Sequence, residues 1–350
     1  MSGPIRTPRI RALANGTLLP SLIAAQIDST SHATADRFRL TMALPAPPFG
    51  TNVASILQNA GQLLEVQAST DGLAWTSLVQ GEIDHLRLDP VSQRLTLEGR
   101  DLSARLIESR LTETFTNQTA SDVATTLAGR HGLAANVQTT ATPIGAYWQL
   151  EHDVVSLDSF CRSHSEWDLL LTLAAREGFD LWVSGTTLNF QPTAQSTSAP
   201  TTIAVSDCLS IVLERSLTLA RDIEVTIKSW NSREAKGFSR TARTARTGPS
   251  AGLSPLRAIQ IIPNLSLADA QAIAQSRLAD LTRQERILTA NMPGDLILAP
   301  RQQLALAGTA TDFDQLYWIE RITRSLTWRS GFTQTIRARN ASPGIEVEFL

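Results

Sequence analysis

The sequence predicts an α+β fold that is mainly β, with two barrel-like β domains and a small α+β domain between them. Hydrophobic and polar residues alternate over much of the first hundred residues, as in half-buried strands. The middle of the chain changes to helical spacing, and strand-like segments return near residue 203. A chain of 350 residues has the length of about two or three domains. We place these domains at 1–105, 106–200 and 201–350.

The first domain contains a predicted β-hairpin with one buried face. Its strands are Glu82–Leu88 and Arg94–Gly99, and its turn lies at Asp89-Pro90. A period of two places the leucines of both strands on one side of the hairpin; they are Leu86, Leu88, Leu95 and Leu97. The other segments expected here are strands at Arg37–Leu44, Leu63–Ser69 and Leu73–Leu78 and a loop at Pro45–Pro48.

The middle domain contains the most clearly marked helix, Ser165–Glu177. Hydrophobic residues recur at helical spacing at Trp167, Leu170, Leu171 and Ala174. Ser165 and Asp168 have the spacing of a capping box, and Gly178 lies where a helix ends in the left-handed conformation. The other elements expected are helices at Ser121–His131 and Ser156–Ser163, a hairpin of Phe179–Val183 and Thr187–Phe190 turned at Ser184-Gly185, and a linker at Gln191–Thr202.

The last domain is predicted to be a second barrel-like set of strands with a long helix, 266–287, capped by Ser266 and Asp269. The strands expected are Asp222–Trp230, Leu296–Leu298, Gln303–Ala307, Tyr317–Trp328 and Thr333–Arg339, with a polar stretch containing Gly237 and Gly248. Both β-rich ends have an early strand, a helix, two short strands and a closing hairpin. The shared order indicates one barrel-like fold used twice.

The composition excludes several classes of protein. The net charge is −2, so no overall basic field attracts nucleic acid. Two cysteines in the chain are too few for a disulfide framework, which indicates synthesis in a reducing cytoplasm. We expect no secretory signal at the N-terminus and no membrane insertion. The charged content of 18% fits a surface covered by neighbours in an assembly, or a monomer solvated by Ser, Thr and Gln.

No catalytic or cofactor motif is found, and we expect neither an enzyme nor a bound cofactor or metal. Cys161 and His164 form a CxxH pair, but zinc would need further ligands from distant His152 or Cys208. The candidate acids of a hydrolase, namely Glu166, Asp168 and Glu177, do not share one helix face. Asp168 is better explained by the helix cap, and Glu177 by a solvated helix end.

A basic segment stands apart from the rest of the sequence. Its residues are Arg233, Lys236, Arg240, Arg243 and Arg246. We interpret the segment as a subunit-contact loop that binds an acidic neighbour. A passage for DNA and a solvated loop are the alternatives, and DNA is less favoured because aromatic residues for base stacking are absent.

Three segments of the chain stand out: EGRDLSARLIESRLTETFTNQTASDVATTLAGRHGL at 98–133, SEWDLLLTLAAREGFDLWVSGTTLNFQP at 165–192, and MPGDLILAPRQQLALAGTATDFDQLYWIERITRSLTWRSGFTQTIRARN at 292–340. Together they resemble the late-control-D family of phage tail proteins, which are central baseplate hubs. The first closes the first barrel with a Gly-Arg-Asp turn. The family motifs also contain Trp167, Asp168, Gly178 and Phe179, and then the helix-to-strand turn Pro293, Gly294 and Asp295.

The resemblance implies a structural hub with two tail-tube-like barrels per subunit, similar to the hub part of type VI secretion spikes. Three subunits would form a homotrimer with six quasi-equivalent barrels, joining a hexameric tail tube to a separate trimeric spike protein. Further implied partners are the tape-measure protein, other baseplate proteins and DNA in transient passage. Segment 345–350 would be either a strand that docks on the spike or the end of the last barrel. The implied location is the baseplate of a virion.

Two other functions remain open. The same hub occurs in contractile bacteriocins and extracellular injection systems, and the sequence does not separate these from a phage. The less favoured alternative is a tail-associated cell-wall hydrolase, which would need two carboxylates close together in a cleft.

Overall fold

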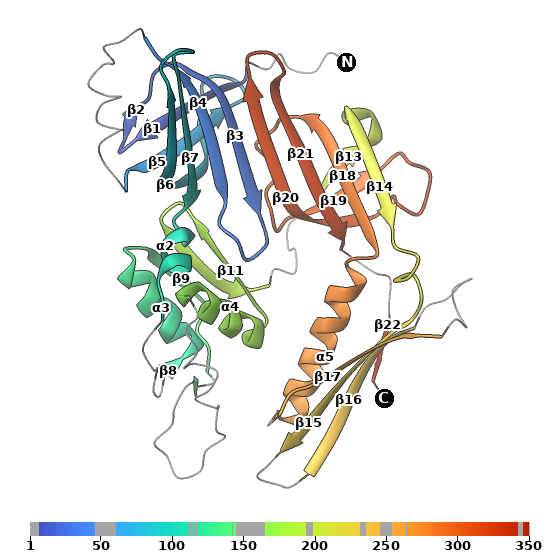
Figure 1. The fold of residues 1–350 in the computed structure, drawn as a ribbon. Coiled ribbons are helices and arrows are strands. Elements are labelled where there is room, and N and C mark those ends of the chain that lie inside the picture. Colours follow the sequence, from blue (N-terminus) through green and yellow to red (C-terminus); the bar gives the residue numbers. More distant parts are fainter. Residues whose placement is uncertain are drawn as a thin grey trace. The chain divides into compact units, whose positions relative to one another are not determined.

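The computed structural model describes residues 7–45, 61–111, 115, 118–141, 143–144, 165–193, 199–231, 236–245, 254–263, 265–341 and 346–349. Contacts within the chain define two units. Unit 1 contains Met1–Thr197, Asn291–Arg301 and Glu320–Thr335; unit 2 contains Ser198–Ala290, Gln302–Ile319 and Ile336–Leu350. Strands predominate in both units (Figure 1), so the predicted class, α+β and mainly β, is confirmed. The division into three domains stays a prediction.

Unit 1 is built on an antiparallel sheet in the order β20-β3-β4-β7-β6-β5-β1-β2. The strands are β1 (Arg9–Ala14), β2 (Thr17–Leu18), β3 (Leu22–Thr30), β4 (Arg37–Ala43), β5 (Leu63–Ser69), β6 (Thr76–Asp89), β7 (Arg94–Asp101) and β20 (Leu316–Thr327). Alternate residues are buried along the inner strands, for example Phe38, Leu40 and Met42 on β4. The period of two thus gives the sheet one hydrophobic face.

The predicted β6–β7 hairpin is confirmed, with Leu86 opposite Leu97 and Leu88 opposite Leu95. The separate strand predicted at Leu73–Leu78 is wrong, because β6 is one strand that begins at Thr76. The Asp71 side chain accepts hydrogen bonds from the backbone of Leu73 and Ala74, which extends the preceding turn to that point.

The Gly-Arg-Asp turn expected after the hairpin is instead part of β7. Gly99 pairs with Ile83, and the strand continues to Asp101. A Cβ atom at Gly99 would lie 2.4 Å from the Phe38 ring and 2.0 Å from the Glu82 carbonyl oxygen. Glycine is needed here for close packing between strands and not for a turn.

The rest of unit 1 includes an α+β block (Figure 1). Its elements are α2 (Ser103–Glu108), β8 (Gln118–Thr119), α3 (Ala120–Arg130), β9 (Ala134–Val137), β10 (Pro143–Ile144), α4 (Glu166–Glu177), β11 (Phe179–Ser184) and β12 (Thr187–Pro192). Strands β11, β12 and β9 form one sheet, β12 and β9 being parallel. Helices α3 and α4 share a hydrophobic core with this sheet, to which Leu127, Leu170 and Phe190 contribute. The predicted helix Ser156–Ser163 and the loop at 46–48 lie outside the described residues.

Helix α4 confirms the predicted capping box of Ser165 and Asp168 and the left-handed end at Gly178, where φ is 69°. The buried face differs slightly, because Leu169 and Leu173 are buried whereas Leu171 is half-buried. The hairpin turns at Gly185-Thr186, one residue later than expected, since Ser184 already pairs with Thr187.

Unit 2 contains a four-stranded sheet in the order β17-β15-β16-β22, with α5 packed on one face. The elements in the second half of the chain, in addition to β20, are β13 (Thr201–Ala204), a 3₁₀ helix (Val205–Asp207), β14 (Ser210–Arg215), β15 (Ile223–Asn231), β16 (Lys236–Ala245), β17 (Leu256–Ile261), α5 (Leu267–Thr282), β18 (Arg286–Pro293), β19 (Gln303–Ala307), β21 (Gly331–Asn340) and β22 (Glu346–Phe349). Strands β18, β20 and β21 contribute residues to both units.

Several predicted boundaries in the second half of the chain are wrong. The helix 266–287 ends at Thr282, because Glu285 joins an ion-pair cluster and Arg286 begins β18. Leu296–Leu298 is a turn and not a strand. The linker Gln191–Thr202 is shorter, since β12 reaches Pro192 and β13 begins at Thr201. The stretch around Gly237 is strand β16, whereas Gly248 lies outside the described residues.

We expect Gly99→Ala to lower the free energy of unfolding by about 1–3 kcal/mol, because the added methyl group overlaps Phe38 and the β6 backbone. The measurement is urea unfolding followed by circular dichroism. Gly129→Ala in α3 is the control: a Cβ there meets nothing within 4 Å, and alanine favours a helix by about 0.5–1 kcal/mol. Equal effects of the two substitutions would contradict the packing argument.

Candidate functional site

Glu166, the first candidate acid, is a buried structural carboxylate. It is 1% exposed. One oxygen accepts from Arg130 Nη1 at 2.6 Å, and the other lies 2.5 Å from His131 Nε2. Asp168 accepts from the backbone N–H of Ser165 and so caps α4. Both carboxylates therefore hold the start of the helix in place, and Glu177 is its last residue.

The other residues of the α4 motif join the helix to its surroundings. Trp167 is 3% exposed, and its indole N–H donates to the Ala33 carbonyl oxygen at 3.1 Å. This bond ties α4 to the loop between β3 and β4. Phe179 packs against Phe190 across the β11–β12 hairpin, with the ring centroids 5.1 Å apart. Gly178 supplies the left-handed residue from which β11 starts.

A small polar pocket in unit 1 was not predicted. Its lining includes His32, Asp36, Asp101, Trp182 and Arg301. Asp36 accepts from the Thr30 backbone N–H at 2.8 Å, and its own N–H donates to Asp101 at 3.2 Å. Burial, with the nearby Asp101 carboxylate, raises the pKa of Asp36 to about 7. Burial also raises the pKa of Asp101, which accepts from the Ser103 backbone N–H at the start of α2.

Arg301 supplies the positive charge of this pocket. Burial lowers the pKa of its guanidinium, whereas Asp180, Asp36 and Asp101 raise it. The guanidinium also lies over the Trp182 ring, 4.9 Å from its centroid. The pocket therefore joins the end of the sheet to the β11–β12 hairpin through buried charge. No motif in the sequence signals it, because the acids and the arginine come from three distant segments.

Pro293 is the last residue of strand β18, and Gly294 and Asp295 follow it, so the helix predicted before the motif is wrong. A Cβ atom at Gly294 would lie 2.5 Å from the Phe332 ring, and the Gly294 N–H donates to the Phe332 carbonyl oxygen. Asp295 accepts from the backbone of Ile297. Arg324, 5% exposed, donates to the carbonyl oxygens of Asp295 and Leu298.

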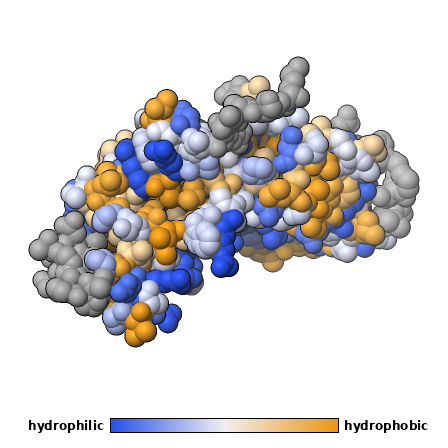
Figure 2. All heavy atoms as spheres, turned by 90° about the horizontal axis from the view of Figure 1, so that it is seen from above, coloured by the Kyte–Doolittle hydropathy of each residue, from blue (hydrophilic) through white to orange (hydrophobic). Residues whose placement is uncertain are grey.

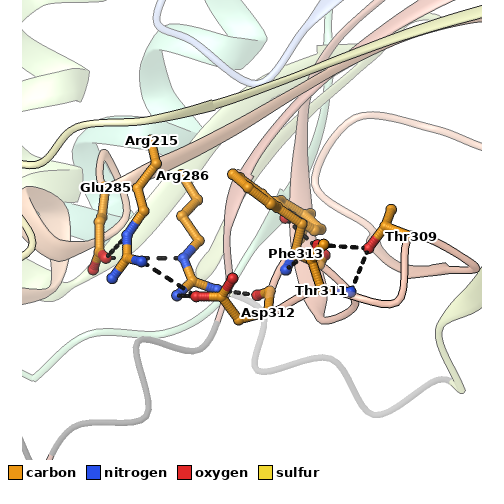
Figure 3. Close-up of polar contacts among 8 residues, drawn as sticks. Arg215, Glu285, Arg286, Thr309, Thr311, Asp312 and Phe313 are labelled. Atoms are coloured by element: carbon orange, nitrogen blue, oxygen red, sulfur yellow. Dashed lines mark hydrogen bonds and ion pairs between the residues drawn. The ribbon is translucent and has the colours of Figure 1, made fainter. Parts of the chain in front are cut away.

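The third resembling segment, 292–340, also contains the loop between β19 and β20 (Figure 3), with the pattern G-T-x-x-x-F-D-x-x-Y from Gly308 to Tyr317. Asp314 accepts from Thr309, and the buried Tyr317 hydroxyl donates to the Phe313 carbonyl oxygen at 2.9 Å. Asp312 pairs with Arg215 at 3.2 Å and with Arg286 at 2.8 Å. Arg215 also binds Glu285, which is 2% exposed, at 3.0 Å. Hydrogen bonds within the motif thus shape the loop, and ion pairs of Asp312 anchor it.

The basic segment was predicted to be a loop, but its described residues lie on a strand. Lys236, Arg240 and Arg243 belong to β16, which pairs with β15 from Lys236 to Arg243. Arg243 lies opposite Glu224, and its guanidinium is 3.8 Å from Asp222. Arg233 and Arg246 lie outside the described residues. The contact role of the segment stays a prediction.

The predicted CxxH pair, Cys161 and His164, and also His152, lie outside the described residues. Cys208 is half-buried, and its thiol donates to the Ala204 carbonyl oxygen. In the described part of the chain, no group of three or more His, Cys, Asp or Glu side chains gathers as it would around a metal ion. None of the helices there combines the length and the hydrophobicity that crossing a bilayer requires.

A scan against models of known protein families finds no match, and neither does a search of curated proteins. Solved structures do match over nearly the whole chain. The tail protein from Neisseria meningitidis has a TM-score of 0.71 at 17% identity, over 95% of this chain and 97% of its own. The 43 kDa tail protein of prophage MuSo2 from Shewanella oneidensis has a TM-score of 0.70 at 15% identity, over 97% of this chain and 100% of its own.

A component of the type VI secretion system of E. coli is also similar. It has a TM-score of 0.57 at 13% identity, over 96% of this chain and 77% of its own. That protein is described as structurally similar to tail proteins of bacteriophage T4. The chain therefore has the fold of phage tail proteins, as the sequence motifs predicted.

We expect Asp36→Asn to gain stability relative to the wild-type chain as the pH rises. The folded pKa of about 7 lies above the ordinary 3.8, so folding takes up a proton between these values. The stability that the wild-type chain gains from this proton uptake is fully present below pH 3.8 and is lost as the pH rises to 7. Between pH 5 and pH 8 the difference in unfolding free energy should change by about 2 kcal/mol in favour of Asn.

The measurement is urea unfolding at both pH values. Asp71→Asn is the control, because backbone hydrogen bonds lower the pKa of this exposed carboxyl and place its titration below the range tested. A pH-independent effect of Asp36→Asn would contradict the titration of this pocket.

We expect Glu285→Gln to cost about 2 kcal/mol or more, because it removes the buried charge that faces Arg215 and Arg286. Thermal and urea unfolding would measure the loss. Asp280→Asn is the matched control, since its contact with Arg283 is 3.8 Å long and exposed, which predicts a change within about 0.5 kcal/mol. If Glu285→Gln left the free energy of unfolding unchanged, the cluster in Figure 3 would not stabilise the fold.

Proposed function

We propose that this protein is the structural hub of a contractile phage tail baseplate, related to the late-control-D proteins. The observation that carries the proposal is the likeness to phage tail proteins from end to end, with 95% and 97% of the chain covered by the first two matches. A fold shared over the whole chain favours the same kind of role more than a likeness confined to one domain does.

The motifs support an architectural role. Trp167 and Asp168 fix helix α4, Gly294 admits the Phe332 ring, and Asp314 closes its loop. Each of these residues acts within the fold. The carboxylates considered for hydrolysis also have such tasks, since Glu166 is paired with Arg130 and His131 and Asp168 caps a helix. We therefore infer a non-enzymatic protein.

The hub acts as a symmetry adaptor. Three copies, each with barrel-like domains at 1–105 and 201–350, form a ring of six similar domains. One side of the ring seats a hexameric tail tube, and the other seats a separate trimeric spike protein. The tape-measure protein and then DNA pass through the centre, and other baseplate proteins bind outside. The protein is made in the bacterial cytoplasm and ends in the virion. A bacteriocin or injection-system particle would use the same adaptor.

We expect light scattering of the purified chain to give three times 38.0 kDa over a range of concentration. The same sample should bind the tail tube and spike proteins encoded beside it, as measured by co-elution in gel filtration. A chain that stays monomeric and binds neither protein would overturn the proposal. Loss of cell-wall lysis with unchanged assembly in Glu166→Gln would instead favour the hydrolase.

A further inference from the structure

The surface of the protein mixes hydrophobic and hydrophilic residues, as Figure 2 shows for one face of the molecule. The pocket beside Asp36 differs from that surface, because charged groups lie in it partly or wholly away from water. Asp101 is 7% exposed, and both Asp36 and Arg301 are half-buried. The empty volume of the pocket, its mouth included, is about 230 Å³. A side chain in the pocket therefore has room to change position, and protons can enter from solvent.

The two acids of the pocket are fixed against each other. The Asp36 N–H donates to the Asp101 carboxylate at 3.2 Å, and the Asp101 N–H donates to the Asp36 carbonyl oxygen at 2.9 Å. Each carboxyl also accepts a backbone N–H, from Thr30 in one case and from Ser103 in the other. Neither acid can therefore move away from the other without breaking the end of the sheet where β4 and β7 pair.

Arg301 is held less firmly than the acids. In the part of the chain that the structure describes, its guanidinium has no hydrogen bond and no carboxylate within ion-pair distance, although Asp180, Asp36 and Asp101 act on it electrostatically. It lies instead over the Trp182 ring of β11, 4.9 Å from the centroid. Its backbone φ is 69°, in the left-handed region that residues with a Cβ rarely adopt, and strain of this kind clusters at switch regions. The guanidinium can thus contact either a ring or an acid pair.

The charge of the acid pair depends on one proton. Burial, with the nearby Asp101 carboxylate, raises the pKa of Asp36 to about 7. Ionisation of Asp36 adds a negative charge beside Asp101, and the pair then attracts a cation more strongly. The other charged groups around the pocket are Asp180 on β11 and His32, which lies 3.7 Å from Glu320 of β20.

We propose that Arg301 is a proton-operated arm, which lies over the Trp182 ring while Asp36 is protonated and turns to the Asp36–Asp101 pair when Asp36 loses its proton. A guanidinium binds a carboxylate more strongly than it binds an aromatic face, so the second position is favoured once the charge is present. The first position ties the segment after β18 to the β11–β12 hairpin, and the second releases it. The proton on Asp36 therefore controls how firmly the hairpin is attached to the end of the sheet.

Fluorine NMR of the full chain, with fluorotryptophan in place of its seven tryptophans, follows the arm directly. The spectrum of Trp182→Phe identifies the Trp182 resonance, since that line is lost. A cation over an indole ring changes the fluorine shift, so we expect the Trp182 line to move with a midpoint at about pH 7. The Trp75 line is the internal control and should not move there, because Arg11 lies over that ring at 4.1 Å and its Nε donates to the neutral Gln67.

Three substitutions separate the arm from a simple effect of charge. In Arg301→Met no arm responds to the ionisation of Asp36, and we expect the pH-dependent shift of the Trp182 line to be lost. In Asp36→Asn the line should keep its low-pH position at every pH. His32→Asn is the matched control, because it removes the titratable side chain of the pocket that lies outside the acid pair, and the shift should remain. Circular dichroism and thermal unfolding establish that each variant is folded.

A wild-type Trp182 line that stays in place from about pH 6 to about pH 8 overturns the arm. A shift that persists in Arg301→Met also overturns it, since the Asp36 charge would then act on the ring directly. Loss of the shift in His32→Asn would assign the titration to His32 and exclude Asp36 as the switch. The wild-type and Arg301→Met titrations decide the question even where Asp36→Asn does not fold.

Discussion

The pairing of β3 with β20 is the constraint on which unit 1 depends. It joins residues 24–30 to residues 321–327, which are separated by most of the chain. The Thr323 hydroxyl donates to Asp28 at 2.5 Å across this joint, and the Ser31 N–H donates to the Glu320 carbonyl oxygen. The sheet that contains β1 is therefore completed by a strand near the other end of the sequence, which is synthesised much later. Such long-range pairing slows folding, because the entropy of closing the loop is lost before the contacts form.

Local patterns predicted the elements that depend on local interactions. The capping box and the glycine end of α4 were readable because they lie within a few residues of one another. The β6–β7 hairpin was readable from the alternation of its leucines. Strand β16 was missed because Arg, Thr and Ala give no clear alternation, and its place in a sheet is set by β15 and α5. The Asp36 pocket was missed because Asp101 and Arg301 reach it from distant positions.

The resemblance in sequence indicated the fold better than it indicated contact surfaces. The motif residues lie inside the fold or in its turns, where geometry restricts what a side chain can be. A surface that binds a neighbour needs only the right mixture of charge and hydrophobicity, which many sequences supply. This is why the basic segment was noticed from its composition, whereas its place in a sheet needed the register of the strands.

The contact of Gly294 with the Phe332 ring limits how these two positions can evolve. A side chain at 294 would overlap the ring, so any larger residue there requires a smaller one at 332. The two positions would therefore change as a pair. If position 294 changes first, the larger residue overlaps the ring; if position 332 changes first, the smaller residue leaves a void.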